Sequence, residues 1–210
     1  MTVARVFFAS FFHALVETEQ KKKKAQTPMD AGALDVPHLR ETTRYLVLGS
    51  GGVHGSSIVG ALAAFEHLLG EAHVDAFYER IDGCIGTSIG ALIATSVVMG
   101  IRARRMLEIM LRLPWERVSV GLNANSLVHG CGMDTRCSLE YLVRHSLEQG
   151  GVAPTSTMRD MWRLTRKKLV VCVADVTHSR MLHISHETHP ELRVLDAVVA
   201  SMCIPVLFEP

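Results

Sequence analysis

The sequence has little that would hold a disulfide scaffold or a structural zinc ion. Its five cysteines, at positions 84, 131, 137, 172 and 203, are odd in number and form no Cys-x-x-Cys pair. Because disulfides persist mainly in oxidising compartments, this cysteine usage favours a reducing one. We expect neither a bound metal nor a cofactor.

The chain also lacks a net charge of either sign. Its 22 lysines and arginines face 21 aspartates and glutamates, which leaves a formal net charge of +1 over 210 residues. Such a balance provides no overall basic field to hold nucleic acid, so nucleic acid is not an expected partner. Hydrophobic residues at 48% and charged residues at 20% are typical of a globular domain.

No run of eighteen apolar residues occurs, so the sequence predicts no transmembrane helix. The apolar segment 6–16 precedes four lysines at 21–24 and a polar, turn-rich stretch without helical or strand periodicity. Three interpretations of residues 1–43 stay open: a poorly ordered or partly helical extension with a linker, a membrane-surface anchor, and a cleaved signal peptide. We expect a cytoplasmic or peripheral-membrane location.

From residue 44 on, strand-like apolar runs alternate with helical patterns. We expect strands at 45–48, 81–85, 169–174 and 181–185, with a strand-like run at 206–208. We expect helices at 56–69, 89–99, 102–113, 139–147, 158–164 and 192–202, and an irregular stretch at 115–137. The alternation predicts an α/β layer fold for a domain over residues 44–210.

A first glycine-rich turn, Gly-Ser-Gly-Gly-Val-His-Gly at residues 49–55, lies between a predicted strand and a predicted helix. Such a turn can direct several backbone N–H groups at one anion. The spacing is wrong for a P-loop, and no lysine follows Gly55. Two uses remain: a dinucleotide site, for which the glycine pattern is a weak signal, and an oxyanion hole.

A second turn, Gly-Thr-Ser-Ile-Gly at residues 86–90, has the strand-to-helix context of a nucleophile elbow. The turn is so sharp that a Cβ at Gly86 or Gly90 would collide with neighbouring backbone. The pattern Gly-x-Ser-x-Gly arises by chance about 0.07 times in a chain of this length. We predict that Ser88 is a nucleophile rather than only a helix cap, and that it faces the N–H groups of Gly51 and Gly52 across one carbonyl.

With a third block, Ala-Ser-Met-Cys-Ile-Pro-Val-Leu-Phe-Glu-Pro at 200–210, the sequence resembles the patatin-like phospholipases over residues 44–210. The resemblance implies a patatin-like α/β sandwich with a mostly parallel central sheet. It implies hydrolysis of fatty-acid esters by a Ser–Asp pair, with lipid or phospholipid as partner and peripheral membrane contact as a further option. The site would consist of the nucleophile Ser88, the oxyanion-hole amides of Gly51 and Gly52, and the supporting residues Gly86, Gly90, Gly55 and His54.

The sequence departs from the family pattern in two places. Ser50 stands where the loop usually has glycine, and His54 stands where it has Arg or Lys. No aspartate matches the base, because the family's Asp-Gly pair follows the block that ends here at Pro210, and Asp82-Gly83 lies upstream of the elbow. We therefore expect the C-terminal part of the domain to be missing. A serine without a base is a poor nucleophile, so an inactive lipid- or membrane-binding module is the alternative function.

Two further interpretations stay open. A Ser-His-Asp arrangement would use Asp160 or Asp175 and one of the histidines at 178, 183, 186 and 189. These histidines crowd a predicted hairpin, however, and Asp175 is expected to accept hydrogen bonds at the end of a strand. A nucleotide-binding domain would instead use the turn at 49–55.

Overall fold

The computed structural model describes residues 35–114, 132–134, 137–203 and 206–208. The segment interpreted above as extension, anchor or signal lies outside the described residues as far as residue 34. No helix among the described residues is long and apolar enough to cross a membrane. The elements in chain order are α2 (Val36–Thr42), β1 (Tyr45–Leu48), η2 (Gly52–His54), α3 (Gly55–Leu69), α4 (Glu71–Arg80), β2 (Gly83–Thr87), α5 (Ile89–Val98), α6 (Ala103–Arg112), β3 (Gly132–Asp134), α8 (Cys137–Gln149), α9 (Met158–Thr165), β4 (Lys168–Asp175), β5 (Arg180–Ile184), α10 (Val194–Met202) and β6 (Val206–Phe208).

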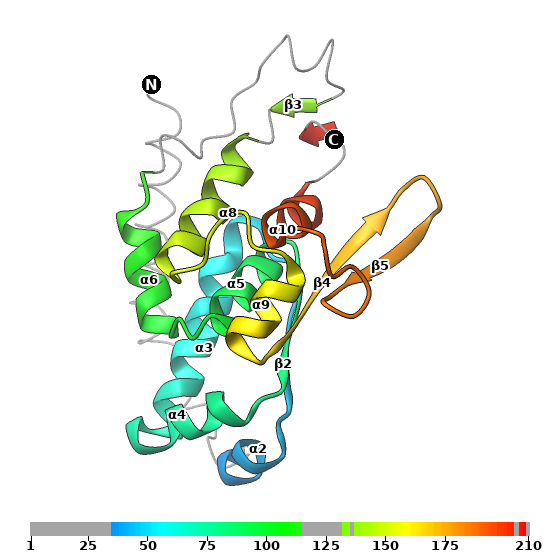
Figure 1. Ribbon diagram of the computed structural model, residues 1–210. Coiled ribbons are helices and arrows are strands. Elements are labelled where there is room, and N and C mark those ends of the chain that lie inside the picture. Colours follow the sequence, from blue (N-terminus) through cyan, green and yellow to red (C-terminus); the bar gives the residue numbers. More distant parts are fainter. Residues whose placement is uncertain (1–34, 115–131, 135–136, 204–205, 209–210) are drawn as a thin grey trace.

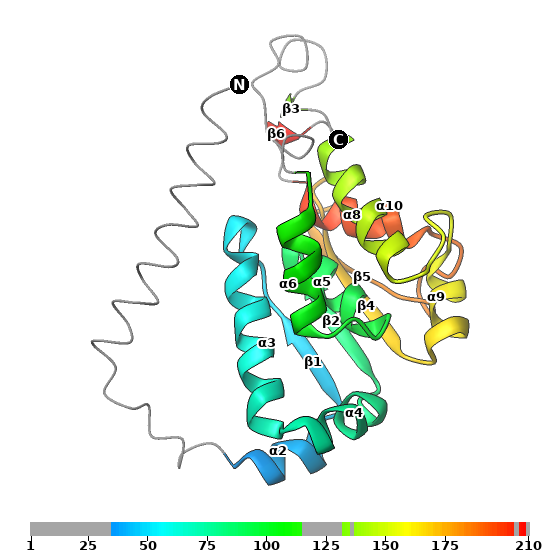
Figure 2. The same ribbon diagram turned by 90° about the vertical axis from the view of Figure 1, so that its left-hand side faces the viewer.

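Four strands form the central sheet in the order β1-β2-β4-β5. Strands β1, β2 and β4 run parallel, and β5 returns antiparallel to β4. The predicted α/β fold with a mostly parallel sheet is therefore confirmed. Figures 1 and 2 show α3, α5, α6 and α8 gathered on one face of this sheet, and Figure 1 shows the outer end of the β4–β5 hairpin extending beyond these helices.

Helix α5 is the centre of the core. All its residues from Gly90 to Val98 are buried, as expected for a helix that is mainly apolar. The hydroxyls of its polar residues Thr95 and Ser96 donate to carbonyl oxygens of the helix itself. It ends before Gly100, whose φ of 82° a residue with a side chain rarely adopts. The helix packs on β1, β2 and β4, so the turn that leads into it is held against the sheet.

Glu66 joins three helices at the edge of the core. Its Oε1 accepts a hydrogen bond from the Tyr78 hydroxyl of α4 at 2.8 Å and another from the N–H of Ala103, the first residue of α6, at 3.0 Å. Burial, followed by the bond to Glu66, raises the pKa of Tyr78. This carboxylate therefore fixes α6 against α3, with α4 beside them.

Among the described residues, the α-helices α2 and α4 were not predicted from the sequence. Helix α2 lies in the stretch judged to lack periodicity, and it begins because Asp35 accepts a hydrogen bond from the N–H of His38 at 3.0 Å. Helix α4 buries Val74, Phe77 and Tyr78, whose spacing of three and four residues places them on one helical face.

Strands β4 and β5 differ from the prediction by one residue at each end, and β2 and β3 differ more. Strand β2 begins at Gly83 rather than at residue 81. Strand β3 lies inside the stretch expected to be irregular, where it pairs in parallel with β6. Long-range pairing of this kind is not visible in a three-residue segment of sequence, because such a segment is too short to show periodicity.

Candidate active site

Ser88 occupies a sharp turn between β2 and α5. Its φ of 55° and ψ of −125° are a backbone conformation that residues other than glycine rarely adopt. Strain of this kind costs about 1–3 kcal/mol and persists only where the surrounding structure holds it in place. The half-buried serine therefore has the strained strand-to-helix geometry that a nucleophile elbow requires.

Neither Gly86 nor Gly90, the glycines two residues before and after Ser88, has room for a side chain, because backbone atoms lie too close. A Cβ at Gly86 would lie 2.4 Å from the carbonyl oxygen of Gly90 and 2.5 Å from the Cα of Ala91. A Cβ at Gly90 would lie 2.3 Å from the carbonyl oxygens of Leu48 and Gly49. The collisions predicted for both positions are thus confirmed.

The first glycine-rich turn lies directly against this elbow. Because β1 and β2 are adjacent and parallel, both turns leave the sheet at the same edge. A Cβ at Gly55 would lie 2.4 Å from Cγ1 of Ile89, and one at Gly51 would lie 3.6 Å from Cγ2 of the same residue. The expectation that the two turns lie side by side is confirmed.

Two backbone donors of this loop lack a partner among the described residues. The N–H groups of Gly51 and Gly52 form no hydrogen bond with another described residue. The carbonyl oxygens of these glycines accept bonds from the N–H groups of His54 and Gly55, which closes the short helix η2. The exposed His54 stands at the start of α3, and its side chain does not cap that helix.

The backbone of Ser88 is held from two directions. Its N–H donates to Oγ of Ser201 at 2.8 Å, and that hydroxyl donates in turn to the carbonyl oxygen of Cys172 at 2.6 Å. Its carbonyl oxygen accepts the N–H of Ala91 at 2.8 Å. Ser201 belongs to the family-like block at 200–210, which is the one signal in the sequence from which its contact with the elbow could have been inferred.

No carboxylate or imidazole of the described residues forms a hydrogen bond with the Ser88 hydroxyl. Asp82 pairs with Arg44 at 3.2 Å and precedes β2, whereas Ser88 follows it. At about 3.3 Å per residue, the length of the strand separates these two residues by roughly 20 Å. The Asp-Gly pair upstream of the elbow therefore lies at the wrong end of β2 to serve as the base.

Asp175 closes the β4–β5 turn. Its carboxylate accepts hydrogen bonds from Nδ1 of His178 at 2.9 Å and from Nε of Arg180 at 3.1 Å. Partial burial raises the pKa of Asp175, but these hydrogen bonds outweigh the burial and leave the pKa below its usual value. Asp175 is thus a hydrogen-bond acceptor at the end of its strand, as predicted.

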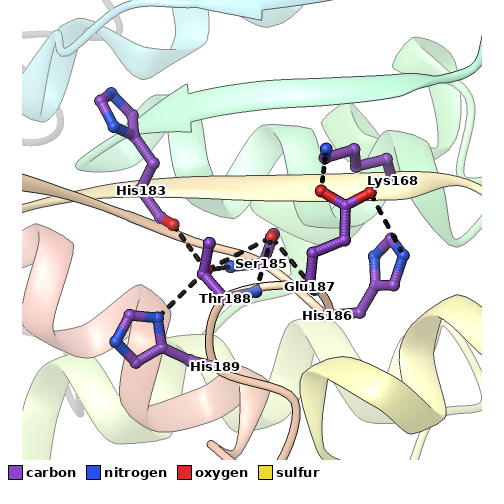
Figure 3. A network of polar contacts seen from close by, with 7 residues as sticks. All are labelled: Lys168, His183, Ser185, His186, Glu187, Thr188 and His189. Atoms are coloured by element: carbon purple, nitrogen blue, oxygen red, sulfur yellow. Dashed lines mark hydrogen bonds and ion pairs between the residues drawn. The ribbon is translucent and has the colours of Figure 1, made fainter.

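The other candidate histidines belong to β5 and to the loop that follows it. Figure 3 shows this network, in which Thr188 donates to the carbonyl oxygen of His183 at 2.7 Å and lies 3.1 Å from Nδ1 of His189. His186 stacks on Trp162, with ring centroids 4.8 Å apart. Within the described residues, no hydrogen bond links these histidines to Ser88, and no group of His, Cys, Asp and Glu is placed to hold a metal ion.

An apolar cavity of about 80 Å³ adjoins the elbow. Residues of α3, α5, α6 and α8 form its wall, among them Gly55 from the end of the first turn and Ile89 from the residue after Ser88. Its polar members include Ser96 and Ser146, whose hydroxyl oxygens lie 3.1 Å apart. Because these two hydroxyls bond each other, the cavity presents a mainly apolar surface.

Comparisons with solved structures agree with the fold of this chain. The match to the crystal structure of the type III effector ExoU covers 79% of this chain and 39% of the ExoU chain, with 16% identity and a TM-score of 0.52. ExoU bound to SpcU, from Pseudomonas aeruginosa, gives 17% identity and a TM-score of 0.50 over the same shares. VipD from Legionella pneumophila gives 15% identity and a TM-score of 0.54 over 80% of this chain and 43% of its own.

At these identities the likeness shows the fold alone, and the chain spans about two fifths of the length of the structures it matches. No curated protein matches the sequence significantly. A family model described as patatin-like phospholipase, however, matches residues 46–210, which is most of the sequence. The chain therefore belongs to the patatin-like phospholipase family.

Proposed function

We propose that this chain carries a lipid acyl hydrolase site in which Ser88 is the nucleophile. The observation that carries the proposal is the positive φ of Ser88. The turn that holds it has a glycine on each side, at positions where a side chain would collide with backbone atoms. A serine that only caps a helix needs no such strain, because an N-cap residue ordinarily lies in the extended region. The strain instead favours a hydroxyl held at the edge of the sheet for reaction.

The amides of Gly51 and Gly52 are proposed to form the oxyanion hole. They belong to a loop that touches the elbow at Ile89 and Gly90, and neither N–H has a partner among the described residues. Donors that are already in place stabilise the charge that develops on a carbonyl oxygen without reorganisation during the reaction. Loss of one such donor typically lowers kcat about 100- to 1,000-fold.

The proposed reaction is acyl transfer through serine. Oγ of Ser88 bonds to the carbonyl carbon of a fatty-acid ester, the ester C–O bond breaks, and the hydroxyl proton leaves with the alcohol. Water then cleaves the acyl-serine, which releases the fatty acid and restores the hydroxyl. The family resemblance implies that an aspartate carries the proton, and no aspartate of this sequence matches that role.

The apolar cavity supports an acyl chain as the group that is transferred. Gly55, which adjoins the proposed oxyanion loop, and Ile89, which adjoins the nucleophile, both line this cavity. A hydrocarbon chain gains about 0.8 kcal/mol for each CH₂ group buried in such a surface. Lipid or phospholipid esters are therefore the proposed substrate class, and contact with a membrane surface is the proposed way of reaching them.

One observation favours a second function, a lipid-binding module without catalysis. The Ser88 hydroxyl has no hydrogen-bonded base among the described residues. A serine in that state keeps its proton at neutral pH and attacks esters slowly. In that case the cavity would bind an acyl chain and no acyl-serine would form.

Reaction with a fluorophosphonate separates the two functions. We expect the reagent to modify Ser88 and mass spectrometry to place the adduct on the peptide that contains it. Ser88→Ala should abolish the adduct, whereas Ser57→Ala, a change at an exposed serine of α3, should leave it intact. Absence of any adduct on Ser88 in the folded protein would support the lipid-binding module, and an adduct that survives in Ser88→Ala would refute the assignment of the nucleophile.

A further inference from the structure

A single hydroxyl group, that of Ser201, connects the elbow to two other elements. Ser201 lies at the end of α10 and is half-buried. Its Oγ accepts the N–H of Ser88 at 2.8 Å and donates to the carbonyl oxygen of Cys172 in β4 at 2.6 Å. The contact joins residues 113 positions apart in the sequence.

We propose that Ser201 is a positioning residue for Ser88, which it holds in the strained conformation that presents Oγ for reaction. The proposal rests on the proposed function for its chemical consequence. The link between the two serines, however, can be tested without any reaction.

The position of the hydroxyl explains why it would have this effect. The pairing between β2 and β4 ends at Thr87 and Cys172. The hydrogen bonds of the sheet therefore no longer hold the chain at Ser88. The two hydrogen bonds of the Ser201 hydroxyl link Ser88 to Cys172, and so they connect the two strands one residue beyond the end of β2. The carbonyl oxygen of Ser88 is already held by the first turn of α5. With Ser201 in place, both backbone polar groups of the strained residue are fixed.

The role requires a group that accepts and donates at the same time. A hydroxyl does both, because it has one O–H donor and two lone pairs. Alanine and valine supply neither, and either would leave the N–H of Ser88 and the carbonyl of Cys172 without this partner. Threonine keeps the hydroxyl, and valine has nearly the same shape as threonine without it. Ser201→Thr and Ser201→Val therefore form a matched pair that separates hydrogen bonding from packing.

A control for general destabilisation comes from Ser185. This serine is buried, and its hydroxyl accepts the N–H of Glu187 at 3.2 Å and lies 3.3 Å from Oγ1 of Thr188 (Figure 3). It lies in the loop after β5, outside the proposed catalytic machinery. Ser185→Ala should lower thermal stability and leave the reactivity of Ser88 unchanged.

The experiment measures two quantities on the full chain: hydrogen exchange of the Ser88 amide by NMR, and the rate of fluorophosphonate labelling. We expect Ser201→Val to speed the exchange at least 10-fold and to slow labelling about 10- to 100-fold, since a misplacement of about 1 Å can cost 100-fold in rate. Ser201→Thr should remain close to wild type in both. Melting temperatures of all variants show whether each one is folded.

The outcomes are distinguishable. Equal exchange of the Ser88 amide in the threonine and valine variants would overturn the proposal. Where wild-type Ser88 is labelled, equal labelling rates in the two variants would overturn it as well. If wild-type Ser88 takes no label while its amide exchange still depends on the residue 201 hydroxyl, the nucleophile assignment fails and the structural link stands. If Ser185→Ala slows labelling as much as Ser201→Val does, the effect is general destabilisation and the positioning role is refuted.

Discussion

Gly90 offers the sharpest test of how the two turns fit together. An alanine there would bring its Cβ to 2.3 Å from the carbonyl oxygens of both Leu48 and Gly49. Both oxygens belong to backbone at the end of β1, and neither is the far end of a flexible side chain. To restore ordinary contact, the end of β1 or the elbow must move by about 1 Å, and overpacking on this scale costs about 3 kcal/mol.

Part of that cost is offset, because Gly90 lies in α5 and alanine favours a helix over glycine by about 1 kcal/mol. We therefore expect Gly90→Ala to lower the free energy of unfolding by about 2 kcal/mol, which corresponds to a fall in Tm of roughly 4–8 °C. The same displacement separates the Gly51 and Gly52 amides from Ser88. Fluorophosphonate labelling should therefore slow by about 100-fold.

A matched control is Gly60→Ala in the middle of α3. A Cβ at Gly60 has no heavy atom within 4 Å, so this change should raise stability by about 0.5–1 kcal/mol and leave labelling unchanged. Urea denaturation and labelling kinetics measure both variants. If Gly90→Ala is as stable as wild type, or if both glycine variants shift stability in the same direction, the close packing of the two turns is refuted.

Two further predictions concern thiol reactivity and pH. Burial raises the pKa of the Cys84 thiol to about 12, so its thiolate fraction at pH 8 is about 1,000-fold below that of an ordinary cysteine. Maleimide should therefore modify the exposed Cys137 in the folded protein and Cys84 only after unfolding. Modification of Cys84 before unfolding would contradict its burial. The lowered pKa of Asp175 means that its carboxylate stabilises the fold above the ordinary Asp pKa of about 3.9, and that this contribution is lost as the pH falls through the lowered value. The urea midpoint of Asp175→Asn should therefore lie below that of wild type at pH 7 and approach it near pH 2, and equal deficits at both pH values would refute this reasoning.

Much of the fold was predictable because its helices and strands carry clear patterns. The apolar run at 45–48 forms β1, and the mainly apolar segment that follows Ser88 forms the buried helix α5. Helix α4 was missed although Val74, Phe77 and Tyr78 have helical spacing, because that apolar face is short and polar residues surround it. Helix α2 depends on its Asp35 cap and has no buried residue, so it offered no apolar pattern to read.

The sequence alone indicated the elbow, because the contact that excludes a side chain at Gly86 comes from Gly90 and Ala91 of the same turn. The contact that excludes one at Gly90 comes from Leu48 and Gly49 at the end of the neighbouring strand, so it depends on the tertiary structure. Tertiary structure decided which distant groups meet there. It placed the first glycine-rich turn against Ile89 and Gly90, removed Asp82 to the far end of β2, and engaged His178 in a hairpin turn. It also brought Ser201 to the N–H of Ser88, since strand order and register set such contacts and neither is encoded in local spacing.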